Sequence, residues 1–407
     1  MNTPVVSQTP IKKKQGYHTL ILVALSHSVS HMYAALMPIL YPSIMAEFGF
    51  GYTQLGFMVG VGNTLQSLMQ GVYVFLMRRI YRKVLLASGN FLLALSVGLM
   101  TLTGGVVPFS IVQVLARVST SSQDPVGNSF VAEGFGKKLR GTAFALNFAG
   151  GNVGTLIVPV LGTIGLATFG WRTTLLIFAL LACIAGFLIL TIQEKPLTEE
   201  KKATASGKII WSAAGKDWIE PLKDKNIRQV ILGATVAAGG RGIGVVMIYI
   251  PLYFQQELHL KSVDYATLFT IMMIASVAGP LIVGRISDSI GRKWTAMATY
   301  TLTALSTVSL FFAGKNMNYL VVAVSFLGIV AFAQSSQIQA LIADVSSREM
   351  RNMAYSVFFT ITYLAGGIWS VIMGITVDRL GFNGAFVLMS LSCIAGAFSL
   401  IRVRVRI

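Results

Sequence analysis

The tetrapeptide Cys183-Ile184-Ala185-Gly186 recurs as Cys393-Ile394-Ala395-Gly396, 210 residues further along a chain of 407 residues. Other residues repeat at almost the same separation. The further pairs, 210 or 211 residues apart, are Arg82 with Arg292, Lys83 with Lys293, Glu47 with Glu257, Glu133 with Asp344, Arg140 with Arg351, Ala143 with Ala354 and Gly170 with Gly381. A near-constant offset along the chain indicates an internal duplication. The sequence therefore predicts two similar halves.

The composition is that of a membrane protein. Hydrophobic residues make up 54% of the chain and charged residues only 12%, whereas soluble proteins average about 25% charged residues. A soluble protein of this length needs a charged surface, and this chain has too few charged residues to build one. The composition excludes a soluble enzyme, a secreted disulfide scaffold and a disordered chain. It leaves a helical protein that crosses the membrane several times.

Twelve apolar stretches are long enough to cross a bilayer, which takes about 20 helical residues. The predicted helices cover residues 18–45, 54–77, 84–104, 107–132, 141–168, 172–192, 229–255, 263–286, 294–314, 318–343, 352–377 and 383–401. Glycine-containing joints such as Gly104-Gly105 and Phe169-Gly170 separate several of them. We expect an all-α membrane protein with twelve transmembrane helices in two pseudo-symmetric six-helix bundles.

A polar segment over residues 193–228 lies between the sixth and seventh helices. It divides the chain into an N-terminal bundle (1–192), a cytoplasmic linker (193–228) and a C-terminal bundle (229–407). Within the linker, Ile209, Trp211, Trp218 and Ile219 are compatible with a short interfacial helix. A plain solvated linker is the alternative.

The basic residues predict the orientation. If both termini and the linker lie in the cytoplasm, 26 of the 32 Lys and Arg residues fall on that side and four on the other. This positive-inside bias accounts for the net charge of +17 without a nucleic-acid partner. We expect a multi-pass protein of the cytoplasmic (inner) membrane, surrounded by the lipid bilayer, with an uncleaved first helix. Cys183 and Cys393 lie in apolar stretches and indicate no disulfide framework.

One loop carries a recognisable motif. Gly284-Arg-Ile-Ser-Asp288-Ser-Ile-Gly291-Arg292-Lys293 joins the eighth and ninth helices, and it fits the loop G-x-x-x-D-x-x-G-R-K of the major facilitator superfamily. The chain resembles this transporter family. The resemblance implies two like-oriented bundles that rock about a substrate near mid-bilayer, and a loop that latches the bundles together in one state. Ordinary positive-inside charge is the other interpretation of the loop, and the first-half copy, Val74 to Lys83, lacks both glycines and the acid.

The first half is similar to the fosmidomycin-resistance-like branch of the superfamily. The matching stretches are Ser26-His27 through Tyr33, Leu36 to Pro42, Glu47 to Phe50, Tyr52 to Gly56, Gly150 to Gly154 and Gly170 to Arg172. The branch has an acid four residues after the histidine, where this chain has His31, so proton coupling through that carboxylate is not carried over. The fifth-helix glycines with Pro159 resemble an antiporter signature, and they equally suit close helix packing.

Arg241 is the most distinctive single residue. It lies in the middle of the seventh helix, in Gly239-Gly240-Arg241-Gly242-Ile243-Gly244. A charged Arg at the bilayer centre costs about 2.5–3.5 kcal/mol, so it should face water or a partner. The glycines indicate a loosened helix or a close helix contact, and no nucleotide loop, because no Lys-Ser/Thr follows them. We expect Arg241 to contact substrate or a gate; a structural ion pair is the alternative.

Two histidines on the first helix complete the predicted substrate site. His31 is the 210-residue partner of Arg241, and His27 lies one turn earlier on the same face. The resemblance places both helices at a central cavity, where such groups suit a phosphonate, phosphate or carboxylate. Because imidazole titrates near neutral pH, His27 and His31 are also candidates for proton coupling. Hydrogen bonding between helices is the other interpretation, and no further ligand cluster indicates a metal. Tyr33 joins the candidates for substrate binding.

Arg117 and Asp124 lie seven residues apart on the fourth helix, roughly 10 Å along its axis. Asp124 is the only acid deep within a first-half span, which makes it the best candidate for a titrating carboxylate. The resemblance associates a fourth-helix arginine with proton coupling. A buried charge balanced by Arg117 is the structural alternative.

The remaining polar candidates fall into two groups. Gln66, Gln334 and Gln337 are expected to line a polar path, or else to join helices. Asp288, Arg292, Glu133, Arg140, Asp344 and Arg351 lie at the cytoplasmic ends of helices, where we expect latch pairs that control gating.

These observations predict a secondary transporter that exports a small anionic or amphiphilic compound, a drug or a metabolite, in exchange for protons. Import of an organic anion or nutrient by a symporter or uniporter is the alternative, because the same fold serves both. A membrane receptor or scaffold that transports nothing is less well motivated. No P-loop, cofactor site or nucleophile–base–acid set is apparent, so neither an ATP-driven pump nor an enzyme is expected. The resemblance implies a monomer.

Overall fold

The computed structural model describes residues 13–77, 79–194, 220–347 and 350–405. All elements within these ranges are helical. They are α1 (Lys13–Phe48), α2 (Tyr52–Leu76), α3 (Arg82–Met100), α4 (Val106–Ser119), η1 (Thr120–Ser122), η2 (Gln123–Gly127), α5 (Asn128–Gly134), α6 (Lys137–Leu190), η3 (Glu220–Lys223), α9 (Lys225–Val236), η4 (Ala237–Gly240), η5 (Gly242–Val246), α10 (Met247–Leu252), η6 (Tyr253–Glu257), α11 (Ser262–Ile290), α12 (Arg292–Phe311), α13 (Met317–Val345) and α14 (Arg351–Leu400). The predicted interfacial helix, with Ile209, Trp211, Trp218 and Ile219, lies outside the described residues, as does Arg78.

The twelve predicted spans are confirmed. Two of the helices each contain two spans, because α6 and α14 run for 54 and 50 residues, which at 1.5 Å per residue is more than twice the thickness of a bilayer core. Each reverses direction at a glycine with positive φ, at Gly170 (φ 75°) and Gly381 (φ 67°). L-residues rarely adopt this conformation. Below, the first arm of α6 means residues 137–169, and the first arm of α14 means residues 351–380.

Two predicted helices are not continuous. The predicted fourth helix comprises α4, η1, η2 and α5, with a π-helical turn at Gln123–Gly127 that contains Asp124 and Pro125. The predicted seventh helix comprises α9, η4, η5, α10 and η6. Proline and clustered glycines are the ordinary causes of such interruptions.

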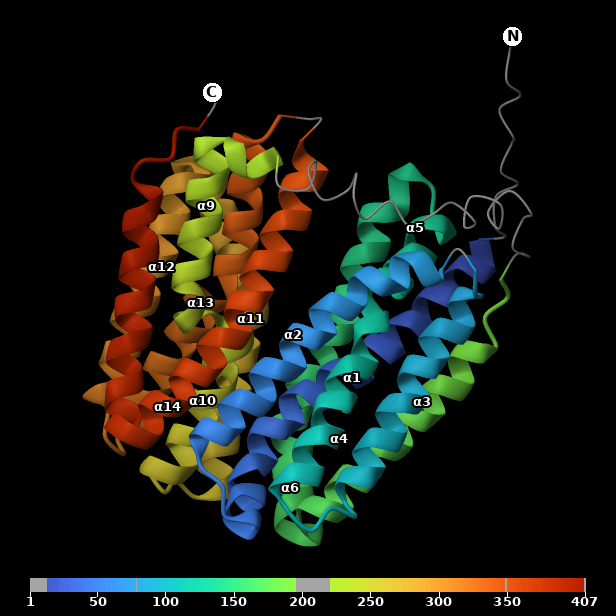
Figure 1. Cartoon of the computed structure of the whole chain (residues 1–407), viewed down its shortest axis with the longest axis horizontal. Coiled ribbons are helices and arrows are strands. Elements are labelled where there is room, and N and C mark those ends of the chain that lie inside the picture. Colours follow the sequence, from blue (N-terminus) through green and yellow to red (C-terminus); the bar gives the residue numbers. More distant parts are fainter. Residues whose placement is uncertain (1–12, 78, 195–219, 348–349, 406–407) are drawn as a thin grey trace.

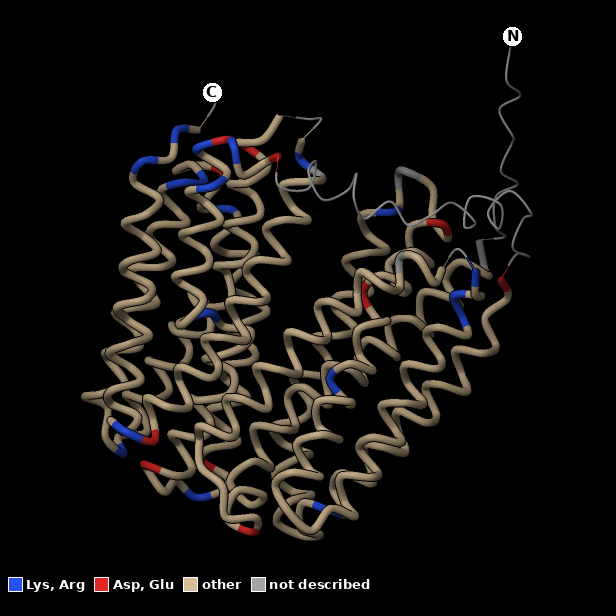
Figure 2. Tube along the Cα trace, viewed as in Figure 1, with Lys and Arg blue, Asp and Glu red and all other residues tan. Residues whose placement is uncertain are grey.

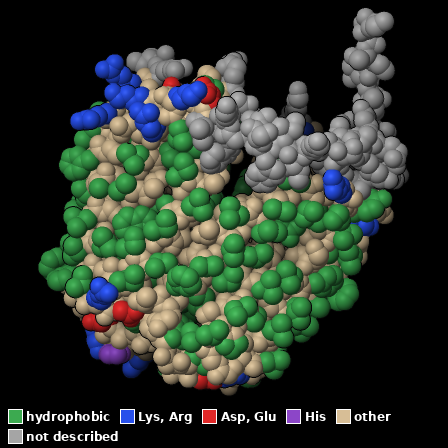
Figure 3. All heavy atoms as spheres, in the orientation of Figure 1, with side chains coloured by type: hydrophobic (Ala, Val, Ile, Leu, Met, Phe, Trp, Pro, Cys, Tyr) green, Lys and Arg blue, Asp and Glu red, His purple; other side chains and the backbone are tan. Residues whose placement is uncertain are grey.

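The helices form two groups, which lie against each other at one end and diverge toward the end that carries both chain termini (Figure 1). We call these ends the closed side and the terminal side. Lys and Arg gather at helix ends, most densely on the terminal side of the C-terminal group (Figure 2). Hydrophobic side chains cover the middle of the visible face (Figure 3), as expected of a surface that meets lipid.

On the closed side, helices from the two halves approach very closely. A Cβ at Gly60 of α2 would overlap the backbone of Gly367 in α14, and a Cβ at Gly56 would overlap that of Ser370. A Cβ at Gly374 of α14 would overlap the backbone of Tyr52. The carboxylate of Asp378 accepts hydrogen bonds from the first backbone N–H groups of α2, at 3.0 Å from Tyr52 and 2.6 Å from Thr53. A carboxylate at a helix N-terminus accepts hydrogen bonds from backbone N–H groups that have no partner within the helix. Its negative charge is also attracted to the positive end of the helix dipole. These contacts hold the two halves together on the closed side.

A second contact joins the halves through α6 and α11. The hydroxyl of Thr163 lies 3.3 Å from that of Tyr265, and both side chains are buried. The two halves are therefore joined by small residues and hydrogen bonds, together with buried apolar side chains of both halves that form one cluster.

Candidate functional site

Arg241 sits at a break in its helix. Its backbone is extended (φ −72°, ψ 134°), and Gly244 has φ 128° and ψ −100°. The glycines before and after it allow other helices to approach, because a Cβ at Gly239 would meet the Trp369 ring and one at Gly242 the Phe332 ring. The sequence prediction of a loosened helix at this point agrees with the structure.

The Arg241 side chain has no carboxylate partner within the described part of the chain. Its Nε donates to the carbonyl of Ile243 at 3.2 Å, and its Cζ lies 5.3 Å from the ring centroid of Tyr363. A Cβ at Gly366 would lie 3.0 Å from Nη2, so the guanidinium rests on the first arm of α14. A cation–π contact and one carbonyl leave most of the five guanidinium donors available.

His27 and His31 form a pair at the contact of α1 with the first arm of α6. Their rings meet edge-on with centroids 4.6 Å apart. His27 is 3% exposed, and its ring lies so close over Gly151 that a Cβ there would approach it to 3.1 Å. Nδ1 of His31 lies 3.2 Å from Oγ1 of Thr155. The fifth-helix glycines thus serve close packing on α1, which was one of their two interpretations.

The surroundings of His31 and Arg241 are equivalent in the two halves. His31 contacts Thr155, and Arg241 rests on Gly366; the members of each equivalent pair are 210 and 211 residues apart. The duplication therefore places an imidazole and a guanidinium at matching positions of matching helix pairs.

Asp124 belongs to neither pair. Its side chain is exposed, and Oδ2 accepts a long hydrogen bond of 3.5 Å from Gln70 of α2. It lies in the π-helical turn of the predicted fourth helix.

Arg117 forms a separate cluster. Its Cζ lies 5.7 Å from the ring centroid of Tyr33, and its stem packs on Gly62 of α2. Both Arg117 Nε and the Tyr33 hydroxyl are buried without a hydrogen-bond partner among the described residues. Arg117 makes no ion pair with Asp124 in the described residues. Their separation of roughly 10 Å along the helix axis is too long for a direct pair.

The three candidate glutamines have different surroundings. Gln66 donates to Thr120 at 3.0 Å. Gln334 donates to Thr303 at 2.9 Å and to the Gly240 carbonyl at 3.4 Å, which the broken helix leaves unpaired. Gln337 is buried, and its Oε1 has no partner in the described residues. Gln334 thus joins helices of the C-terminal half.

The expected latch residues pair within each half, not between halves. Arg82 contacts Glu133 and Glu194, both at 2.7 Å. Arg292 contacts Asp344 at 3.1 Å and Asp288 at 3.6 Å. Elsewhere on the terminal side, Arg351 donates to the Ala343 carbonyl at 2.9 Å, and Arg140 is exposed. These ion pairs of Arg82 and Arg292 thus each lie within one half.

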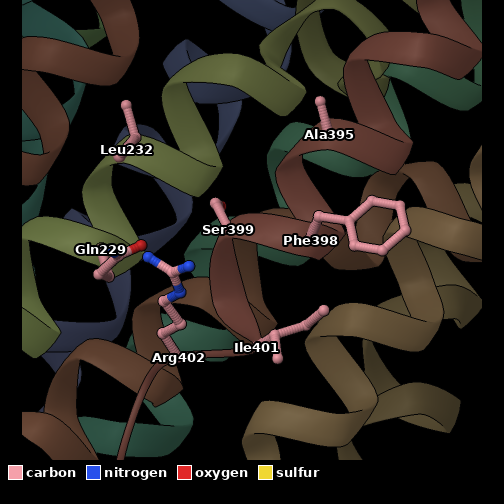
Figure 4. Close-up of a pocket in the computed structure, with 7 residues that line it drawn as sticks. All are labelled: Gln229, Leu232, Ala395, Phe398, Ser399, Ile401 and Arg402. Carbon is pink, nitrogen blue, oxygen red and sulfur yellow. The ribbon is translucent and has the colours of Figure 1, made fainter.

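A surface groove lies away from these residues. A groove of about 570 Å³ at the terminal end of α9 and α14 is lined by Gln229, Leu232, Ala395, Phe398, Ser399, Ile401 and Arg402. Its one charged side chain, Arg402, points toward Gln229 (Figure 4). No group of three potential metal-binding side chains occurs among the described residues.

Several contacts in this region could not be read from the sequence. Tyr363 and Gly366 come from a helix 120 residues after Arg241, and no motif marks them. Gln123 connects helices through Ser26 (2.6 Å) and the Val23 carbonyl (3.3 Å). One signal was present: Gln123 precedes Gln334 by the same 211 residues as the other repeated pairs.

Comparisons with known proteins agree with this architecture. A metabolite transport protein of Haemophilus influenzae is 22% identical over 379 residues, covering 92% of this chain and 93% of that protein. The fosmidomycin resistance protein of Escherichia coli K12 is 21% identical, covering 90% and 88%. The crystal structure of the nucleoside transporter NupG (D323A mutant) has the same fold, with a TM-score of 0.78 at 13% identity over 96% of this chain and 99% of that one.

The sequence pattern of the Major Facilitator Superfamily matches residues 22–266 and 230–406, which together span nearly the whole chain. The resemblance predicted from the loop at Gly284–Lys293 is thereby confirmed. With its twelve membrane-spanning helices in two bundles, the chain belongs to the Major Facilitator Superfamily of membrane transporters.

Proposed function

We propose that this protein exports a small organic anion across the cytoplasmic membrane in exchange for protons, with Arg241 as the anion-binding residue. The observation that carries the proposal is the guanidinium without a carboxylate partner at a break in a membrane helix. A buried permanent charge is costly unless it is compensated. An anionic substrate would supply the missing charge, and Arg offers the donor geometry that suits carboxylate and phosphate groups.

Asp124 is the proposed proton carrier. It is an exposed carboxylate within a membrane span, and it accepts a hydrogen bond from Gln70 at 3.5 Å. A proton on Asp124 is proposed to change how tightly the anion binds at Arg241, because exchange requires such a linkage between the two ligands. His27 and His31 are proposed to take part in binding or proton transfer.

Alternating access follows from the two bundles. In this conformation the closed side is held by α2 with α14 and by α6 with α11. We propose that the bundles, residues 1–192 and 229–407, rock about the Arg241 region, and that the loops at Arg82 and Arg292 bridge the halves when the terminal side closes. The terminal side is taken as cytoplasmic because most Lys and Arg residues lie on it. The relation to a fosmidomycin resistance protein favours export over import.

The test begins with ligand identification. The purified chain in detergent is screened by thermal shift against carboxylates, phosphonates, siderophores and cationic drugs, because a ligand that binds the native state raises its melting temperature. Stabilisation by anions in the wild type, and its loss in Arg241→Gln, is the expected result. Arg379→Gln is the matched control, since Arg379 is exposed at the closed side. Stabilisation by cations alone, or full anion binding by Arg241→Gln, contradicts the proposal.

Proton coupling is tested in proteoliposomes with the anion so identified. A pH gradient should drive its flux in the wild type but not in Asp124→Asn, whereas exchange of labelled for unlabelled anion should persist in Asp124→Asn. Retention of gradient-driven flux by Asp124→Asn excludes Asp124 as the proton carrier. The direction in which the gradient drives the anion separates export from import.

A further inference from the structure

Three aromatic side chains form a ladder along the first arm of α14. The ring centroids of Tyr355 and Phe359 are 6.4 Å apart, and the two ring planes are inclined at 29°. The rings of Phe359 and Tyr363 are 6.0 Å apart at 23°. The residues are spaced by four, so the ladder extends roughly 12 Å along the helix. At its inner end Tyr363 lies against Arg241, and at its outer end the Tyr355 hydroxyl donates to the Gln339 carbonyl at 3.0 Å.

The middle rung faces the other half of the molecule. Helical residues are separated by about 100° around the axis, which places Phe359 between Ser370 and Gly366 in the helical projection. Ser370 contacts α2 of the N-terminal half, and Gly366 lies beneath Arg241. Phe359 is 36% exposed. This exposed ring therefore lies on the arc between the contact with the opposite bundle and the Arg241 site, and not on a face that meets lipid.

The N-terminal half has an equivalent ring. Phe148 precedes Phe359 by 211 residues and is 48% exposed. In projection it lies between Gly151, which packs on His27, and Thr163, which contacts Tyr265 of the other half. Its ring centroid is 5.7 Å from that of His27. Each half thus has an exposed phenyl ring near its nitrogen-bearing side chain, the imidazole in the first half and the guanidinium in the second. The ring lies about one to two helical turns closer to the terminal side than that side chain.

We propose that the anion carried by this protein bears an aromatic ring, which packs edge-to-face against Phe359 and Phe148 while its acidic group binds Arg241. An aromatic pair contributes about 0.5–1.5 kcal/mol beyond simple burial, which corresponds to roughly a two- to tenfold gain in affinity per ring. Because Tyr355 and Tyr363 stack on either side of Phe359, the ladder presents the edge of this ring in line with the guanidinium, an arrangement that selects a planar ring joined to a carboxylate or phosphonate. The inference rests on the proposed function, because it specifies the substrate class of the same site.

The test compares three probes on the purified full-length chain by thermal-shift titration. Benzoate has the ring and the charge, cyclohexanecarboxylate has the charge and a similar size without aromaticity, and benzyl alcohol has the ring alone. Benzoate should bind more tightly than cyclohexanecarboxylate. Phe359→Leu and Phe148→Leu should each weaken benzoate about two- to tenfold and leave cyclohexanecarboxylate unchanged, whereas Phe359→Tyr should retain benzoate binding.

Phe187→Leu is the matched control, because this ring is 62% exposed and meets the Phe91 ring edge-on within the N-terminal half. Melting temperatures without ligand establish that each variant is folded. Equal affinities for the two acids, both dependent on Arg241, would overturn the aromatic inference and leave the anion site standing. Binding of benzyl alcohol that depends on Phe359, with no Arg241-dependent binding of either acid, would overturn the proposed anion transport while supporting the ring site.

Discussion

Residues 31 and 241 occupy equivalent places in the two halves, yet the helices that carry them differ. α1 is unbroken through His31, whereas the seventh span is interrupted on both sides of Arg241. A neutral imidazole needs few partners, and Thr155 provides one. A guanidinium is permanently charged and has five donors, and only a locally unwound backbone brings the Ile243 carbonyl within 3.2 Å. The duplication thus preserved the position of the polar residue in the sequence. The backbone around it differs between the halves, and this difference accompanies the change from an imidazole to a guanidinium.

The two equivalent glutamines show a similar divergence. Gln123 belongs to a buried chain of hydrogen bonds in which Asn90 donates to Ser26 and Ser26 donates to Gln123. Gln334 instead donates to Thr303 and to the free Gly240 carbonyl. Both glutamines also donate to a backbone carbonyl: Gln123 to that of Val23 in the continuous helix α1, and Gln334 to that of Gly240 at the break in the seventh span. A residue that repeats in sequence can thus have a different structural role in each half.

The largest expected effect concerns the two nitrogen-bearing residues themselves. Arg241→Gln should weaken binding of the transported anion about 10- to 100-fold, because bonds to a charged donor are worth about 1.5–3 kcal/mol each. His31→Leu should weaken it by about three- to tenfold, because it removes an uncharged hydrogen-bonding group. Thermal-shift titration with the anion from the screen measures both. Equal losses in the two variants would mean that the halves contribute equally and would end the asymmetry inferred here.

The next effect separates the two glutamines by stability. Gln123→Leu should lower the free energy of unfolding by about 1–3 kcal/mol, because it removes the acceptor of the buried Ser26 hydroxyl. Gln334→Leu should cost about 1 kcal/mol, since two of its three contacts are long, at 3.4 Å to the Gly240 carbonyl and 3.9 Å to the Cys393 sulfur. Denaturation of the purified chains in detergent tests the order. A larger loss for Gln334→Leu would show that the unpaired Gly240 carbonyl dominates.

A third comparison addresses the two contacts that close the molecule. Asp378→Asn should weaken the hydrogen bonds that cap α2 by about 1 kcal/mol. The equilibrium between conformations in which this side is closed and those in which it is open should then shift about fivefold toward the open ones. The residue equivalent to Asp378 in the first half is Ala167, so the α6–α11 contact has no such cap. Thr163→Val, which removes one hydroxyl bond at 3.3 Å, should shift it less. Distances between spin labels on the closed side of each bundle report both shifts, and no change in Asp378→Asn would contradict the gating role.

The smallest effects are expected for the ion pairs on the terminal side. Arg82→Gln should destabilise the protein more than Arg292→Gln, because Arg82 and Glu194 are 14% and 4% exposed and Arg292 and Asp344 are 37% and 33% exposed. Exposed pairs contribute about 0–1 kcal/mol. Melting temperatures at low and high salt would measure the difference. The reverse order would indicate that Arg292 has a partner in a conformation other than this one.

Much of the fold was predictable from local features. Span lengths, glycine joints and the 210-residue offset predicted twelve helices in two bundles, because burial in lipid demands long apolar segments whatever their neighbours are. The loosened helix at Arg241 was also predictable from its glycines. The π-helical turn at Asp124 was not predicted, although Pro125 marks the place, because how an interrupted helix re-forms its hydrogen bonds depends on the helices around it.

The sequence by itself determined that this is a duplicated membrane transporter with charged residues at bilayer depth, since hydropathy, spacing and the loop motif are properties of single segments. Only the tertiary structure decided which residues meet. It paired His31 with Thr155, and it placed Arg241 against Tyr363 and Gly366. Helices far apart in the chain contribute these partners, and their approach is set by small residues packing against backbone, a geometry that no local pattern encodes.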